Sequence, residues 1–257
     1  MRRLNRNDGI EVEAGMKFCM AQIRSSAGRV NGNVEVHIEM ARQAAARGAD
    51  LVVFPELSVT GYEPELAGRL AMDLSDPRLA AIRSASVSLQ IAISAGFPLK
   101  QETLPCISMM TFYPNRESQL YTKQRLHVDE LPFFSNGTKQ VILQVRGTRI
   151  CPGICYETRF EESFQQAKEL NADVYTASVA KPNENIDEAY EHYARVSKRF
   201  EIITAVSNCV GPAGDFMGAG QSAAWGTDGR RLASMGEKAT GLLLVDSIHQ
   251  TAECIEW

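Results

Sequence analysis

Short, wholly apolar segments alternate with segments of helical periodicity along most of this chain. Residues 51–54, Leu-Val-Val-Phe, contain no polar side chain, which is typical of a strand covered on both faces. Apolar residues recur at helical spacing in residues 33–47 and 187–201. Further strands are predicted at 18–23, 90–96, 106–113, 141–146, 148–151, 173–177, 203–207, 221–225 and 241–246, and further helices at 63–72, 77–88 and 160–170. This alternation predicts an α/β domain in which helices cover a sheet.

The pattern favours one domain rather than two. The 257 residues are enough to bury a sizeable core, and no linker, charge block or short repeat divides them. We predict a single domain over residues 16–257. Residues 1–15 are polar and lack periodicity, so we expect a flexible N-terminal segment there.

Composition and charge exclude several functions. With 27 basic and 31 acidic residues, the chain has no electrostatic reason to bind nucleic acid or an anionic membrane. It has no apolar run long enough to span a membrane, and its charged start does not resemble a secretory signal, so a cytoplasmic location is expected. The cysteines and histidines form no metal-binding pattern, and no phosphate or dinucleotide motif occurs. We therefore expect neither a metal nor an organic cofactor.

Glu56 directly follows the apolar strand at 51–54. The carboxyl end of a buried strand is where α/β proteins place their binding crevices. Burial raises the pKa of a carboxyl group, which suits a general base working near neutral pH. A glutamate in a turn, paired with an arginine, fits this segment equally well.

Lys123 follows the short stretch 119–121, and Glu130 lies seven residues later beside an apolar cluster. A fixed ammonium group could stabilise a developing oxyanion in a dry site. Most lysines are solvated surface residues, however, and this segment alone does not separate the two interpretations.

Cys155 lies in the segment 150–160, where we expect a strand to break at Pro152-Gly153 before a turn and a helix. Backbone N–H groups at such a turn can hold an oxyanion, and a helix N-terminus lowers the pKa of a thiol. Cysteine is also the most nucleophilic of the usual candidates, provided that a base takes its proton. Taken singly, a cysteine here is more often part of the core.

Together, these three segments resemble the nitrilase superfamily, the carbon–nitrogen hydrolases, whose members share a Glu-Lys-Cys set in this chain order. The matching segments are Phe54-Pro-Glu-Leu57 with Thr60-Gly-Tyr62, Tyr121-Thr-Lys123, and Gly153-Ile-Cys-Tyr-Glu-Thr-Arg-Phe160, with further matches at Ala177-Ser178, Asn208 and Gly220-Gln-Ser222. These matches cover nearly the whole domain. The chain departs from the family at Glu161, where proline is usual, and near 196–201, where a common Arg-Ala-x-Glu-Asn pattern is not recognisable.

The resemblance implies a four-layer α-β-β-α sandwich and a set of site residues. It implies that Glu56 is the general base, Lys123 stabilises the oxyanion and Cys155 is the nucleophile. The same resemblance implies that Glu130 is a second carboxylate beside the lysine. It also implies that the backbone N–H of Tyr156 completes the oxyanion hole, and Tyr62 and Ser178 are expected at the substrate site. The reaction would need no cofactor.

The first hypothesis for activity is hydrolysis of a small aliphatic or carboxylate-bearing amide to a carboxylic acid and ammonia, through a thioester on Cys155. Tyr-Glu after the cysteine is more similar to the amidase branches than the Trp-Glu of true nitrilases. An N-carbamoyl-amine hydrolase is the nearest alternative, followed by a nitrilase. A catalytically silent protein that binds a small molecule is an alternative of a different class.

The resemblance also implies a homodimer or higher homo-oligomer, because members commonly dimerise through the helices predicted here at 160–170 and 187–201. Tyr190 and Ala194 add an apolar stripe beside the core face of the second helix. Such surplus apolar area would suit a two-fold interface. The alternative is that Tyr190 lies on the surface with its hydroxyl in water.

Overall fold

The computed structural model describes residues 4–5, 12–13 and 15–257. The segment 1–15, predicted to be flexible, therefore lies for the most part outside the described residues. Within it, β1 (Leu4–Asn5) and β2 (Val12–Glu13) form a short antiparallel pair.

Two large sheets form the centre of the molecule. The seven-stranded sheet has the order β17 (Thr251–Glu256), β16 (Gly241–Asp246), β3 (Lys17–Gln22), β4 (Leu51–Val53), β5 (Ala92–Leu99), β6 (Cys106–Phe112) and β7 (Gln119–Thr122). The six-stranded sheet has the order β15 (Arg231–Ser234), β14 (Ala223–Trp225), β11 (Ile203–Asn208), β10 (Val174–Val179), β9 (Thr148–Ile154) and β8 (Leu143–Val145). The central strands β3 to β5 and β9 to β11 are parallel within each sheet.

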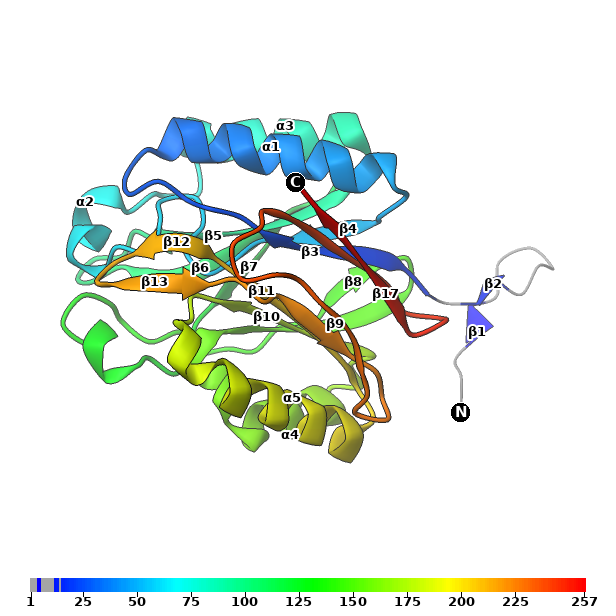
Figure 1. The fold of residues 1–257 in the computed structure, drawn as a ribbon. Coiled ribbons are helices and arrows are strands. Elements are labelled where there is room, and N and C mark those ends of the chain that lie inside the picture. The colour runs from blue at the N-terminus through cyan, green and yellow to red at the C-terminus, as the bar shows by residue number, and fades with distance from the viewer. Residues whose placement is uncertain (1–3, 6–11, 14) are drawn as a thin grey trace.

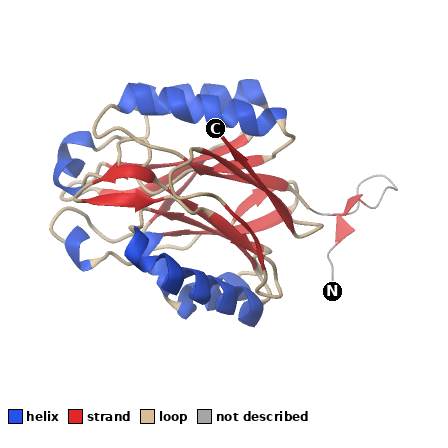
Figure 2. Ribbon diagram, viewed as in Figure 1, coloured by secondary structure: helices blue, strands red, loops and turns tan. Residues whose placement is uncertain are grey.

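Helices cover the two outer faces. The helices α1 (Val30–Ala46) and α3 (Pro77–Leu89) pack on the seven-stranded sheet, and α4 (Glu161–Glu169) and α5 (Ile186–Phe200) on the six-stranded sheet (Figure 1). Colouring by secondary structure shows the two sheets between two helical layers (Figure 2). The predicted α-β-β-α sandwich is confirmed. No helix in the described part of the chain is long and apolar enough to cross a membrane.

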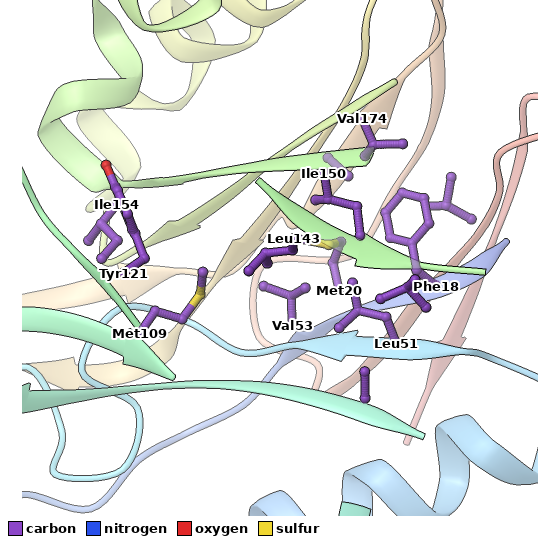
Figure 3. Packing of buried hydrophobic residues seen from close by; sticks show 14 of the residues in the cluster. Phe18, Met20, Leu51, Val53, Met109, Tyr121, Leu143, Ile150, Ile154 and Val174 are labelled. Carbon is purple, nitrogen blue, oxygen red and sulfur yellow. The ribbon is translucent and has the colours of Figure 1, made fainter. Parts of the chain in front are cut away.

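Strand β4 shows why an apolar segment suits this architecture. Leu51 and Val53 point into the core between the two sheets, together with Phe18 and Ile150 (Figure 3). Val52 and the following Phe54 belong to the core between the sheet and its helices. Since side chains alternate between the faces of a strand, both faces of β4 are buried and both need apolar residues.

One expectation about the strands is wrong. Strand β9 does not break at Pro152-Gly153 but continues to Ile154. Its neighbour β8 begins with Leu143 opposite Ile150, so no strand of the described residues pairs with Pro152 on that side and its missing N–H is tolerated. The glycine-rich segment 211–220 is mostly a hairpin of β12 (Val210–Ala213) and β13 (Phe216–Ala219).

Tyr190 on α5 is used within its own chain. Its hydroxyl donates to the carbonyl of Gln221 at 2.6 Å, and its ring meets Trp225 edge-on at 5.1 Å between centroids. The alternative that this hydroxyl lies in water is therefore wrong. The apolar surface that Tyr190 leaves for an interface is also smaller than the sequence indicates.

Candidate active site

Strand direction brings Glu56 and Lys123 to the same edge of the first sheet. Strand β6 is antiparallel to both β5 and β7, so β7 runs parallel to β4 and β5. Glu56 follows the end of β4, and Lys123 directly follows the end of β7. Their side chains meet, with Nζ of Lys123 2.7 Å from Oε1 of Glu56.

The turn that carries Glu56 is held by the strand beside it. The N–H of Phe54 donates to the carbonyl of Ser94, and the N–H of Val59 donates to the carbonyl of Gly96 at 2.9 Å. A Cβ atom on Gly96 would lie 2.7 Å from the backbone nitrogen of Leu57, so only glycine allows this close approach. The backbone around Glu56 is therefore fixed by main-chain contacts, and any residue larger than glycine at position 96 would break them.

Lys123 is the centre of a buried ionic group. Its Nζ lies 2.7 Å from Glu56 and 2.7 Å from Oε1 of Glu130, and all three side chains are buried. The hydroxyl of Tyr62 donates to Glu130 at 3.0 Å, and the N–H of His127 donates to its other oxygen at 2.7 Å. In contrast, Oε2 of Glu56 is buried with no hydrogen-bond partner among the described residues. One carboxylate oxygen therefore remains free to accept a proton.

Cys155 follows β9 and begins the short 3₁₀ helix η3 (Cys155–Arg159). Its φ of 43° lies in the left-handed region, which costs a non-glycine residue about 1–3 kcal/mol and is commonest at functional sites. A Cβ on Gly153 would lie 2.1 Å from the Tyr175 hydroxyl, so the strand before Cys155 also requires a glycine. Cys155 is partly exposed, and its Sγ atom lies 3.8 Å from the carbonyl oxygen of Ala180.

Glu157, two residues after the cysteine, joins the two sheets. Its Oε1 accepts from the Tyr121 hydroxyl at 2.5 Å and from the N–H of Ile154 at 2.7 Å, and its Oε2 accepts from the N–H of Gln124 at 2.7 Å. Two of these donors, Tyr121 and Gln124, are close to Lys123 in the chain, and the third, Ile154, directly precedes Cys155. Sequence reasoning assigned Glu157 no role, although it lies in the Cys-Tyr-Glu segment that was recognised.

Burial and neighbouring charges shift the pKa values of the site. Burial raises the pKa of Glu56 to about 7, despite the attraction of Lys123, and the charge of Glu130 adds to the increase. Burial alone would lower the pKa of Lys123, but attraction to Glu56, Cys155 and Glu130 raises it above its ordinary value. Burial and the charge of Glu56 raise the pKa of Cys155 to about 12, against the expectation that a helix N-terminus would lower it.

A cavity of about 630 Å³ opens in front of Cys155. Of the predicted site residues, Tyr62, Glu130, Cys155 and Tyr156 line it, whereas Glu56 and Lys123 lie buried outside its lining.

Ser178, expected at the substrate site, is not among the residues that line this cavity. It is buried in β10, with its hydroxyl 3.4 Å from Sδ of Met109. The cavity wall also holds residues that sequence reasoning did not single out, among them Lys181 after β10 and Phe216 in the β12–β13 hairpin. A lysine just beyond an apolar strand was the available signal for the first. Within the described ranges, no cluster of three or more His, Cys, Asp or Glu side chains is placed to hold a metal ion.

Comparison with known proteins adds relatives of two kinds. The chain is 26% identical over 217 residues to the glutamine-dependent NAD(+) synthetase of Acinetobacter baylyi, covering 80% of this chain but only 39% of that protein. It is 24% identical to the 2-oxoglutaramate amidase of Bacillus subtilis over 240 residues, covering 91% of this chain and 92% of that protein. The chain thus spans less than half of the synthetase and nearly all of the amidase.

Solved structures share the fold. A mutant of the amidase from Nesterenkonia sp. AN1, in complex with butyramide, superposes with a TM-score of 0.84 at 22% identity, covering 90% of each chain. The sequence model of the carbon-nitrogen hydrolase family matches residues 19–254, which include all three segments that converge beside the cavity. This chain is therefore a member of the carbon–nitrogen hydrolase family, as its three motifs indicate.

Proposed function

We propose that this protein hydrolyses a small amide to a carboxylic acid and ammonia through a thioester on Cys155. The observation that supports this most is that Glu56 is a buried base with a pKa of about 7 and one oxygen without a hydrogen-bond partner among the described residues. This base lies near Cys155, which lines the cavity. A general base works best when its pKa lies near the working pH.

The first step is attack of Cys155 on the amide carbon. The raised pKa of the thiol means that it rests protonated, so Glu56 takes its proton as the S–C bond forms. The carbonyl electron pair moves to oxygen. Lys123 has three N–H donors and the described residues use two of them, which leaves one for the oxyanion. The backbone N–H of Tyr156 is the second proposed donor.

The second half of the reaction releases both products. The C–N bond breaks as protonated Glu56 gives its proton to the leaving nitrogen, so ammonia departs and a thioester remains. Glu56, again a carboxylate, then takes a proton from water as the water oxygen attacks the thioester. When the C–S bond breaks, the carboxylic acid leaves and the thiol of Cys155 is restored with the proton that Glu56 held.

Glu130 and Tyr62 act on Lys123 rather than on the substrate carbon in this proposal. Glu130 holds Nζ at 2.7 Å, and the Tyr62 hydroxyl holds Glu130 at 3.0 Å. The lysine is thereby kept in one orientation, which is what makes a preorganised charge effective in the transition state.

The relatives support an amide as the substrate. They include the Bacillus subtilis 2-oxoglutaramate amidase, an Escherichia coli omega-amidase 27% identical over 138 residues, and the Nesterenkonia amidase that was solved with butyramide. N-carbamoyl amines and nitriles are tested as alternative substrates, since the same cysteine chemistry could act on them.

Ammonia release from a panel of amides, ureido acids and nitriles tests the proposal. We expect amides to be hydrolysed, Cys155→Ala to lose essentially all turnover, and the control Cys254→Ala to keep most of it, because Cys254 lies in β17, away from the cavity. Iodoacetamide should modify Cys155 in parallel with loss of activity. Faster release from ureido acids, or first labelling of another cysteine with loss of activity, would contradict the proposal.

We also propose a homodimer through α4 and α5, on the basis of the family resemblance. Sedimentation equilibrium at micromolar concentration distinguishes it from a monomer of 28.3 kDa. A fully active species at the monomer mass would refute it. The cytoplasmic location stays a prediction from the sequence.

A further inference from the structure

A buried lysine that the proposed mechanism does not use lies in the cavity wall. Lys181 follows β10 and is only 6% exposed. Among the described residues, its Nζ has no hydrogen-bond or ion-pair partner. An ammonium group that faces a cavity and has no anionic partner in the protein attracts an anionic group of a ligand.

The backbone of Lys181 is held in place next to the nucleophile. Its N–H donates to Oδ1 of Asn208 at 2.9 Å, and its carbonyl accepts from Nδ2 of Asn208 at 3.2 Å and from the N–H of Ala219 at 2.9 Å. The preceding carbonyl, that of Ala180, lies 3.8 Å from Sγ of Cys155. The backbone that carries the Lys181 side chain is therefore fixed, and the residue before it lies beside the sulfur of Cys155.

The other basic side chains that line the cavity lie beside carboxylates. Arg159 pairs with Glu188 at 2.8 Å, and Nδ1 of His127 lies 3.2 Å from Asp129. Exposed carboxylates also stand at the rim, among them Glu65, Asp129 and Asp215. An anionic group of a ligand is therefore repelled at the rim and attracted to the inner wall, where Lys181 is unpaired.

We infer that Lys181 binds a carboxylate at the far end of the substrate, so that the preferred substrates are monoamides of small dicarboxylic acids. The inference rests on the proposed function, because it places the amide carbon at Cys155 and the carboxylate at Nζ of Lys181. A charge-assisted hydrogen bond between the two would supply both the missing partner and the orientation of the bound amide.

The test compares two amides of equal length, glutaric acid monoamide and the uncharged pentanamide. In the wild type we expect kcat/KM to be about 10- to 100-fold higher for the monoamide, the range of a hydrogen bond between charged groups. Lys181→Met should abolish this preference, mainly through KM, and Lys181→Arg should restore part of it. The control Lys168→Met removes the same charge from an exposed lysine and should leave the preference unchanged.

Two outcomes would overturn the inference. Equal kcat/KM values of the wild type for the two amides would mean that no carboxylate is recognised. An equal loss for both amides in Lys181→Met would mean that the lysine supports Cys155 or the local structure instead, since its charge also favours the thiolate. Thermal unfolding shows whether Lys181→Met is folded.

A binding measurement keeps this test separate from that of the proposed function. Calorimetric titration of Cys155→Ala with the monoamide needs no turnover. We expect the dissociation constant to rise about 10-fold or more when Lys181→Met is added. An unchanged constant contradicts the inference even if amides are hydrolysed. Absence of hydrolysis by the wild type contradicts the proposed function even if the monoamide binds.

Discussion

Glu56 and Glu157 are buried carboxylates in the same part of the molecule, but their oxygen atoms are bonded differently. Both oxygens of Glu157 accept hydrogen bonds, from Tyr121, Ile154 and Gln124. Glu56 has one oxygen on Lys123, and its other oxygen has no partner among the described residues. The same side chain is thus fully paired in one place and half-paired in the other.

The difference supports a structural role for Glu157 and the proposed role of Glu56 as a base. Buried polar groups are nearly always paired, because an unpaired one loses its hydration without compensation. Glu157 follows this rule and links the loop after Lys123 to the turn of Cys155. Glu56 breaks the rule, and its free oxygen is what proton transfer requires. Substitutions at the two positions should therefore change different properties.

Glu56→Gln should have the larger effect on activity. An amide cannot accept the thiol proton, so we expect kcat/KM to fall about 10²- to 10⁴-fold, the usual contribution of general acid–base catalysis. Stability should be unchanged or higher, because the substitution removes a buried charge. Steady-state kinetics and thermal unfolding measure the two properties. Residual activity above about a tenth of the wild type would remove the base from the mechanism.

Lys123→Ala should lower kcat/KM at least about a hundredfold, as expected when an oxyanion donor is lost. It should also destabilise the fold by about 3–5 kcal/mol, because it leaves Glu56 and Glu130 buried without their cation. Protonation neutralises such carboxylates, so the stability deficit should shrink as the pH falls. Denaturant unfolding at pH 5 and pH 8 tests this, and a deficit independent of pH would contradict the ionic role.

Glu157→Gln should act mainly on stability. The Gln NH₂ group would face backbone N–H donors such as that of Gln124, so we expect a loss of about 1–3 kcal/mol. Activity should fall less than about a hundredfold, through small shifts of Lys123 and Cys155. If Glu157→Gln were as inactive as Glu56→Gln while unfolding like the wild type, the comparison between the two carboxylates would fail.

Glu56 and Cys155 could be proposed as site residues because each comes at or just after a segment predicted to be a buried strand. Glu56 and Cys155 stand just beyond β4 and β9, and these strands were recognisable from their buried residues. The four layers could not be derived from periodicity, which indicates α/β without choosing the topology, and they came from the family resemblance. The break predicted at Gly153 is absent, because this glycine serves a close contact with Tyr175 that is visible only in the fold.

The hydrogen bonds of the site could not be predicted either, because they join residues that only the fold brings together. Glu157 and Tyr121 are 36 residues apart in the chain, and no local pattern pairs them. Likewise, the free oxygen of Glu56 and the unpaired Lys181 depend on which partners the two sheets bring near. The expectation of a lowered pKa for Cys155 considered only the helix N-terminus. In the structure, burial is the larger effect and raises that pKa.

The smallest expected difference between Glu56 and Glu157 lies in the pH dependence of kcat/KM. In the proposed mechanism Glu56 acts as a carboxylate, so kcat/KM should rise with pH to a plateau above about 7, its pKa in the folded protein, and fall about tenfold per unit below it. Glu157 takes no part in proton transfer, so Glu157→Gln should leave this limb in place.

The same pKa also predicts how stability varies with pH. The pKa of Glu56 is raised on folding, so the folded state keeps its proton where the unfolded chain has lost it. The corresponding stability is full below the unfolded pKa of 4.5 and is lost as the pH rises through about 7. In Glu56→Gln, this fall should be absent, whereas in Cys155→Ala it should remain. An acidic limb that moved in Glu157→Gln, or a fall in stability that persisted unchanged in Glu56→Gln, would assign the titration to another group.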